Sequence, residues 1–339
     1  MQKENKILLN TETAIFQELS QLIEQSKAQV VSYANSTLTL LFWQVGKRIN
    51  EHILQNKRAE YGKQIVQTLS AQLEKEFGRS FTERNLRRMM QFAEEFADIE
   101  IVTSLMTKLS WTHFLQLLSL KTMEQKLFYS RKIAEEQWSV RQTQKYIQQK
   151  TYERQEIANS QIVGENTALK DTFKDPYILD FLGMKDGYLE KDLESAIIRE
   201  LENFILELGN GFTFVERQKR IILDGKDFYL DLLFFHRKLK RLVAIELKLD
   251  DFKPAYKGQM ELYLKWLDRY DRQEDENSPI GLILCAGKST EQIELLELHK
   301  DGIMVAEYWT ELPPKKELEA KLHKALIEAK EILERKKLQ

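Results

Sequence analysis

The spacing of apolar and polar positions divides the chain into a helical first half and a mixed second half. Apolar side chains recur at helical spacing through residues 11–56, 61–78 and 82–97. Gly78 is placed to end one of these helices, and Ser110 and Ser139 are placed to cap two later ones. Residues 11–150 are therefore predicted to form an all-helical domain, for which a winged-helix-like arrangement is one possible form.

The pattern changes after residue 175. One helix is predicted over 188–209, then a strand over 214–223 that ends at the turn signal Asp224-Gly225. Continuous apolar runs at 228–236 and 242–248 are typical of strands covered on both faces. Helices and strands then alternate, which predicts an α/β domain with a mixed central sheet over 176–312. Residues 151–175 lose the periodicity and are predicted to connect the domains.

Three charged residues interrupt the two central apolar runs. A buried charge costs several kcal/mol unless it is paired or binds a metal, so Asp231, Glu246 and Lys248 call for a reason. Because side chains alternate along a strand, Glu246 and Lys248 share a face, and Asp231 reaches the same point if the strands are neighbours. Two carboxylates suit a hydrated Mg²⁺, to which the Leu247 carbonyl could add an oxygen. The lysine could position or activate water, or offset charge in a transition state.

Composition narrows the class of protein. The 339 residues are enough for two domains, and the single cysteine excludes an intrachain disulfide. No apolar run approaches the roughly 18 residues of a membrane span, and the first residues form no signal peptide, so a cytoplasmic protein without membrane contact is expected. A phosphate loop of the GxxxxGK[ST] type is absent, and the histidines and the cysteine lack zinc-site spacing.

The net charge of −2 is unevenly distributed. Residues 1–150 contain 21 Lys and Arg against 16 Asp and Glu, whereas the remainder contains 30 against 37. The N-terminal excess permits a nucleic-acid contact, and the acidic C-terminal half suits a site that holds cations.

Asp231, followed by Glu246-Leu247-Lys248, resembles the D…(D/E)xK signature of the PD-(D/E)XK nuclease superfamily, with Leu230 in place of the usual proline. The wider context is similar to the YhcG family of bacterial proteins, in which a helical domain precedes a nuclease-like domain. The similar blocks cover most of the chain: YGKQIVQTLSAQLEKEFGRSFTERNLRRM, LSWTHFLQLL, WSVRQTQKYI, FYLDLLFFHRKLKRLVAIELK, FKPAYKGQMELYLKWLD and PIGLILCA.

This resemblance implies a Mg²⁺-dependent DNA nuclease in which Mn²⁺ can substitute. Asp231 and Glu246 would hold the metal, and Glu194 would assist, unless it is only an acid in the first turn of a helix. Gln259 and Tyr263 match a Gln-xxx-Tyr motif that lies beside the metals and the nucleic-acid strand in some members. The implied catalytic residues are Asp231, Glu246, Lys248 and Gln259, and Tyr263 would contact nucleic acid or simply pack.

The helical half offers a second candidate surface. Two helices joined by a short Gly-containing turn resemble a helix-turn-helix, and the second carries Arg84, Asn85, Arg87 and Arg88 near its start. Arginine and asparagine suit the reading of base edges, although a solvated face of an ordinary helical domain is the alternative.

Two further questions stay open at this stage. A non-catalytic DNA-binding or assembly protein on a nuclease-like scaffold is the alternative function, and RNA is not distinguished from DNA. The predicted C-terminal helix, residues 313–339, carries apolar residues at alternating steps of four and three. It is expected to pack on the domain, with a homodimer through it as the alternative.

Overall fold

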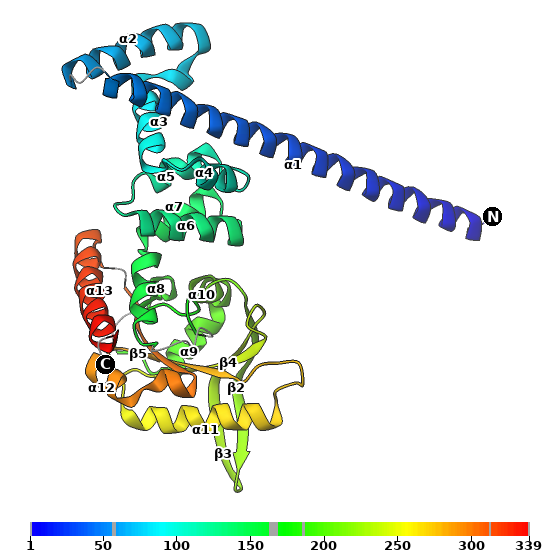
Figure 1. The fold of residues 1–339 in the computed structure, drawn as a ribbon. Helices are drawn as coiled ribbons and strands as arrows, with labels where there is room; N and C mark the ends of the chain where they lie inside the picture. The colour runs from blue at the N-terminus through cyan, green and yellow to red at the C-terminus, as the bar shows by residue number, and fades with distance from the viewer. Residues whose placement is uncertain (1, 56–58, 163–168, 185–186, 312, 338–339) are drawn as a thin grey trace. The chain divides into compact units, whose positions relative to one another are not determined.

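The computed structural model describes residues 2–55, 59–162, 169–184, 187–311 and 313–337 (Figure 1). The chain forms two compact units, residues 1–148 (unit 1) and residues 149–339 (unit 2). Within the described residues no helix has both the length and the apolar character needed to cross a membrane.

Unit 1 is helical. Its elements are α1 (Gln2–Gln55), α2 (Ala59–Phe77), η1 (Arg79–Phe81), α3 (Glu83–Glu95), α4 (Ile99–Met106), α5 (Trp111–Leu117), α6 (Met123–Glu136) and α7 (Val140–Gln148). The helix α2 ends at Gly78, whose φ of +87° favours glycine. The described part of unit 1 contains no strand, so the wing of a winged-helix fold is not formed there.

The core of unit 1 forms where α3 packs on the C-terminal half of α1. Leu86 and Met89 of α3 are fully buried against Phe42 and Ile49 of α1. The backbones approach so closely that a Cβ at Gly46 would lie 1.9 Å from the Met89 carbonyl oxygen. Only glycine fits this crossing.

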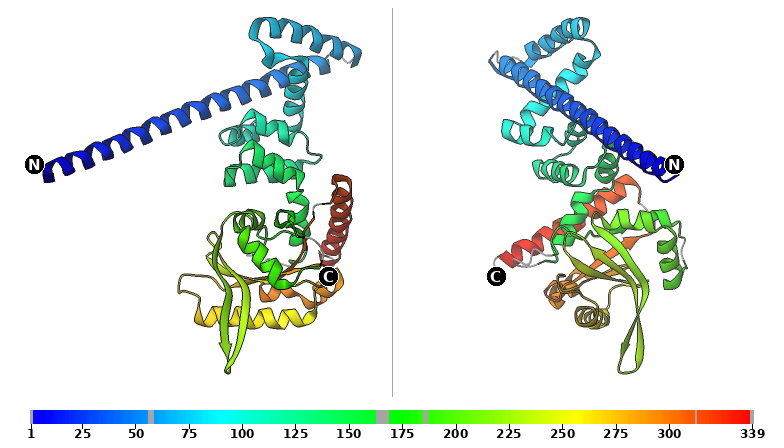
Figure 2. Two further views of the ribbon diagram at one scale, coloured as in Figure 1. Left: turned by 180° about the vertical axis from the view of Figure 1, so that it is seen from behind. Right: turned by 90° about the vertical axis from the view of Figure 1, so that its right-hand side faces the viewer.

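Unit 2 contains a six-stranded mixed sheet in the order β1-β6-β5-β4-β3-β2. The strands are β1 (Tyr177–Ile178), β2 (Phe212–Leu223), β3 (Lys226–His236), β4 (Arg241–Leu247), β5 (Ile280–Cys285) and β6 (Ile303–Trp309). The strands β2, β3 and β4 pair antiparallel, whereas β4, β5, β6 and β1 pair parallel. Asp224 and Gly225 both have positive φ, as the predicted hairpin turn requires. Figure 2 shows the β2–β3 hairpin extending beyond the other strands.

Helices cover both faces of this sheet. The helices α9 (Glu190–Arg199) and α10 (Leu201–Leu208) pack on one face, and α11 (Pro254–Tyr270) and α12 (Thr290–Leu296) pack on the other. Short 3₁₀ turns, η2 (Asp180–Leu182) and η3 (Leu298–Asp301), complete the unit. The single helix predicted over 188–209 is wrong in one respect: Glu200, with φ −106° and ψ 32°, breaks it into α9 and α10.

The stretch predicted as a connection contains α8 (Thr151–Asn159). Arg154 of α8 is fully buried, donates to the Pro176 carbonyl at 2.7 Å and pairs with the Glu207 carboxylate of α10. The Ile178 N–H donates to the same carboxylate at 2.9 Å. The helix α8 is therefore built into unit 2.

The C-terminal helix α13 (Lys315–Lys337) packs on α8, because Leu318 and Leu322 are 2% exposed and contact Ile157. This is the packing expected from the sequence. The side chains of Ala329 and Ile332, which continue the predicted seam, lie outside the described residues.

Candidate active site

The two central carboxylates lie on one side of the β3–β4 pair. The ladder ends at the pair Leu232–Ile245, and Asp231 and Glu246 are the next residues on each strand. They therefore face each other across the strands. The Asp231 N–H lies 3.4 Å from Oε1 of Glu246, and the Leu247 N–H donates to Oδ2 of Asp231 at 2.9 Å. Strand alternation and antiparallel pairing together bring these two acids to one point.

Burial of these two carboxylates raises the free energy of their charged forms. Glu246 is 3% exposed, and burial, followed by repulsion from the Asp231 charge, raises its pKa to about 7. Burial also raises the pKa of Asp231, although the Leu247 N–H and the Lys248 charge oppose the rise. The fold thus holds two carboxylates where a cation would relieve both burial and repulsion.

Lys248 supplies part of that positive charge. Its Nζ lies 3.0 Å from Oε2 of Glu246 and 5.3 Å from the centre of the Tyr256 ring. Burial alone would lower the pKa of Lys248, but the charge and hydrogen bond of Glu246 outweigh it, so the pKa is raised above its usual value. The Lys248 side chain is therefore a charged donor fixed beside Glu246.

Glu194 joins the site through Gln218, a residue that the sequence analysis missed. The Gln218 amide donates to Oε2 of Glu194 at 2.9 Å and to Oδ1 of Asp231 at 3.1 Å. Burial raises the pKa of Glu194, and the Asp231 charge raises it further. Gln218 lies across from Asp231, between the pairs Arg217–Leu232 and Lys219–Leu230, with a φ of +48°. The polar run ERQKR gave no sign of this role, because a strand irregularity near Glu216 sets it.

Gln259 and Tyr263 lie on α11 and are bonded to each other. The Gln259 amide donates to the Tyr263 hydroxyl at 2.8 Å, and that hydroxyl donates to the Tyr229 carbonyl of β3 at 3.2 Å. Tyr263 is 1% exposed, so it presents no surface to a nucleic acid in this structure. The pair braces β3 two residues before Asp231, and a contact of Tyr263 with nucleic acid stays a prediction.

The donor set can be tested against a divalent metal. Within the described residues, no three His, Cys, Asp or Glu side chains converge as a complete set of ligands. Asp231 and Glu246 do supply two facing carboxylates, and Gln218 holds Glu194 to the same group. Mg²⁺ commonly binds through one or two carboxylates and retains several waters, so this donor set fits it.

The four residues that were predicted to contact base edges lie on α3, and three of them make hydrogen bonds within unit 1. Arg87 donates to the Glu83 carboxylate at 2.7 Å, and Asn85 donates to the Ser80 carbonyl at 3.3 Å. Arg88 reaches Asn85 at 3.5 Å, whereas Arg84 is exposed. The geometry leaves Arg84 and the partly exposed Arg87 as the outward cations of this helix.

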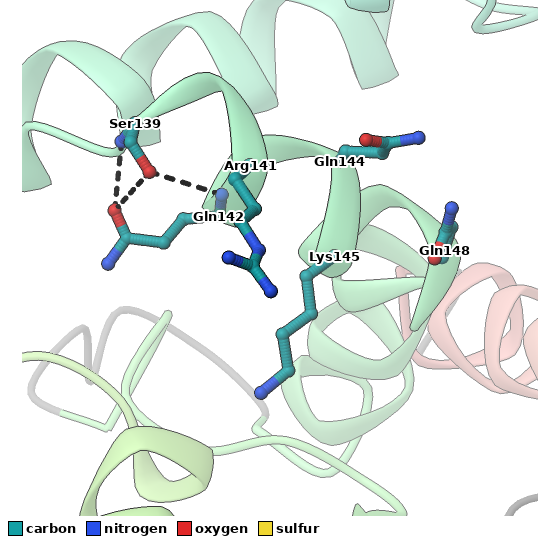
Figure 3. Close-up of a pocket in the computed structure, with 6 residues that line it drawn as sticks. All are labelled: Ser139, Arg141, Gln142, Gln144, Lys145 and Gln148. Carbon is teal, nitrogen blue, oxygen red and sulfur yellow. Dashed lines mark hydrogen bonds between the residues drawn. The ribbon is translucent and has the colours of Figure 1, made fainter.

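A second basic surface lies on α7. Figure 3 shows a pocket of about 520 Å³ in which Arg141 and Lys145 lie one turn apart. Among the described residues, Ser139, Gln142, Gln144 and Gln148 also line this pocket, and none of its described lining residues is acidic. Residues 1–100 contain equal numbers of basic and acidic residues, so the N-terminal excess of positive charge comes from residues 101–150. This excess therefore lies in the segment of the sequence that contains α7 and not in the segment that contains α3.

The sheet, its flanking helices and the Asp231–Glu246–Lys248 group define a PD-(D/E)XK nuclease-like domain. Residues 170–323 match the family described as the YhcG PDDEXK nuclease domain, and residues 18–154 match the DUF1016 N-terminal domain. The Escherichia coli (strain K12) protein named "Putative nuclease YhcG" is 32% identical over 336 residues, which cover 88% of this chain and 90% of that protein. The chain belongs to the YhcG family.

Solved structures give a weaker likeness. A repair endonuclease from Pyrococcus abyssi is 22% identical, with a TM-score of 0.25 over 38% of this chain and 50% of that chain. A structure of an EndoMS–dsDNA complex is also 22% identical, with a TM-score of 0.26 over 38% of this chain and 48% of that chain. These alignments span about half of the solved chains and are too slight to bear on function.

Proposed function

We propose that the protein is a divalent-metal-dependent DNA nuclease that hydrolyses phosphodiester bonds. The observation that carries this proposal is the meeting of Asp231, Glu246 and Lys248 at one buried point. Such a cluster has no evident structural use, since buried carboxylates that repel each other destabilise a fold. Asp231 and Glu246 would hold Mg²⁺, or Mn²⁺ in its place, with Glu194 assisting.

A bound divalent metal would supply Lewis-acid polarisation of the scissile phosphate and a lower pKa for water. The chain's own residues orient what enters the site. Lys248, fixed by Glu246, would donate to the attacking water or to the phosphate as charge develops. The hydrogen bonds from Gln259 to Tyr263 and from Tyr263 to Tyr229 would keep β3, the strand that carries Asp231, in place. Gln218 would keep Glu194 directed at Asp231.

Unit 1 would supply affinity for the nucleic acid. The outward cations Arg84 and Arg87 on α3 and the pair Arg141 and Lys145 on α7 support this role. Contacts from Lys and Arg to phosphates fix register and add affinity, whatever the sequence bound. RNA would be held by the same contacts, so the substrate must be decided by assay.

The decisive experiment incubates the purified protein with linear, nicked, branched and single-stranded DNA and with RNA, in Mg²⁺ or Mn²⁺. Cleavage of DNA is expected to require the metal and to fall at least about a thousandfold in Asp231→Asn, because the loss of metal-based stabilisation is worth several kcal/mol. Asp227→Asn, on the same strand but exposed and paired with Arg220, should cleave normally.

Calorimetric titration with Mn²⁺ shows whether an absence of cleavage means that no suitable substrate was tested or that the metal site does not exist. Binding that disappears in Asp231→Asn but persists in Asp227→Asn supports the metal centre. Cleavage that continues unchanged in EDTA would reject the metal-dependent mechanism. The absence of binding at millimolar metal would reject the proposal in favour of a non-catalytic scaffold.

A further inference from the structure

The N-terminal half of α1 carries an apolar stripe that the described helices of unit 1 leave uncovered. Figure 2 shows this half extending away from the other helices of the unit. Its large apolar side chains are at least half exposed: Phe16, Leu19, Leu22, Ile23, Val30 and Tyr33. Isolated apolar residues on a surface need no explanation, but a continuous row of them marks an interface.

The spacing of the stripe is that of a coiled-coil seam. Phe16, Leu19, Ile23, Ser26, Val30 and Tyr33 follow one another at alternating steps of three and four residues. One heptad position carries Phe16, Ile23 and Val30, and the other carries Leu19, Ser26 and Tyr33. β-Branched residues at two of the three first positions suit two parallel strands, and in a parallel pair the polar Ser26 would meet its own copy and fix the register.

The stripe faces away from the core of unit 1. The C-terminal half of α1 approaches α3 most closely at Gly46. At about 3.6 residues per turn, Gly46 lies roughly 140–160° around the helix from Ile23 and Val30. The described contacts of unit 1 therefore leave the stripe exposed.

We propose that a second copy of this chain covers the stripe, as a parallel and in-register pair of α1 helices. A heptad seam complements a copy of itself, because each side chain enters a gap between those of an identical helix. The other amphipathic helix, α13, already buries Leu318 and Leu322 in its own unit. This proposal is independent of the nuclease activity.

Charge and size agree with self-association. Between residues 15 and 35 the only charges are Glu18, Glu24 and Lys27, and Lys27 pairs with Glu24 at 3.1 Å. Two copies therefore meet little like-charge repulsion. Exposed apolar residues of α1 continue to Leu41. The stripe is therefore about 40 Å long and about 10 Å wide. This area, roughly 400 Å², is comparable with the largest apolar patch of a typical monomer, about 300–600 Å², which is often functional.

The test measures the mass of the full-length protein in solution by light scattering over a roughly hundredfold dilution series. A dimer is expected. The double variant Leu19→Gln, Ile23→Gln should raise its dissociation constant at least about a hundredfold while keeping the helix, since glutamine is a good helix former. Val31→Gln is the matched control: Val31 is 60% exposed but lies off the stripe, and its loss should leave the dimer intact.

Crosslinking tests the register. Ser26 lies within the stripe and Ser32 on the far side of α1, and the native Cys285 is fully buried. On oxidation, Ser26→Cys should give a covalent dimer in high yield, and Ser32→Cys should not. A chain that stays monomeric at every concentration overturns the proposal, as does a dimer indifferent to the Leu19 and Ile23 changes. Equal crosslinking at the two positions overturns it as well.

Discussion

The two units carry their charged residues in opposite ways. In unit 2, Asp231, Glu246 and Lys248 lie largely out of solvent at the end of a strand pair, and the carboxylate pKa values rise as a result. In unit 1, Arg84, Arg141 and Lys145 lie on helix surfaces, where water already solvates them. Burying a charge costs free energy, so a buried charge that the fold retains indicates a function for that residue. An exposed charge costs little, so it indicates a function only where a binding partner is known. The predictions below test this contrast.

After the loss of Asp231, the largest effect is expected at Lys248. Lys248→Met should reduce cleavage about a hundred- to a thousandfold, because it removes a donor that is fixed where charge develops. Metal binding, measured by calorimetry, should persist, since both carboxylates remain. Lys253→Met serves as the control, because Lys253 is exposed and pairs with Asp250. A Lys248 variant that cuts as fast as the native protein would remove this residue from the chemistry.

The pKa of Glu246 predicts how the stability of the metal-free protein depends on pH. Its folded pKa of about 7 lies above the ordinary 4.5, so between these values the folded state holds a proton that the unfolded state has released. The stabilising contribution is complete below pH 4.5 and is lost as the pH rises through 7, a change of up to about 3 kcal/mol. Burial of Asp231 adds to the same trend.

Urea unfolding in EDTA between pH 5 and 8, at spacings of about half a unit, measures this slope. Glu246→Gln should flatten most of it, whereas the same change at the exposed Glu291 should not. An unchanged slope in Glu246→Gln would show that the proton resides elsewhere.

A smaller effect is expected at Gln218. Gln218→Asn keeps a residue that tolerates positive φ but shortens the reach to Glu194 and Asp231, and should cost the metal-free protein about 2 kcal/mol. Gln218→Glu should cost more, since it adds a fourth carboxylate to Asp231, Glu246 and Glu194. Melting temperatures in EDTA and in Mn²⁺ test both, and the metal should restore most of the loss. Native-like melting of both variants in EDTA would contradict the assigned role.

The smallest effects are expected in unit 1. Arg141→Gln with Lys145→Gln should weaken DNA binding about tenfold and reduce the slope of log affinity against log salt by about two, one for each lost phosphate contact. Arg84→Gln with Arg87→Gln is the matched pair on α3, where Glu83 already engages Arg87. Fluorescence anisotropy in Ca²⁺ would compare them. If neither pair alters the salt slope, unit 1 does not hold the nucleic acid through these cations.

Strand alternation was enough to predict that Glu246 and Lys248 share a face, because that rule depends only on sequence position, whereas the meeting with Asp231 also required that the two strands be neighbours. It could not find Gln218, which reaches both acids only because an irregularity near Glu216 shifts the register of β2. Nor could it find the break at Glu200, where the apolar stripe continues although the backbone leaves the helix. The sequence left open whether Tyr263 contacts nucleic acid or packs, since helical spacing locates a face but not what covers it, and the structure buries this side chain. The domain limits and the roles of the site residues stay predictions.

The buried pair of Arg154 and Glu207 constrains how the chain can be divided. A truncation that begins at Pro176, where the change in pattern places the domain start, would delete both Arg154 and Lys174. The Glu207 carboxylate, 5% exposed, would then lose its counter-charges, and a broken buried pair typically costs about 3–5 kcal/mol. An excised nuclease-like domain that is to survive purification must therefore retain α8 as its first helix.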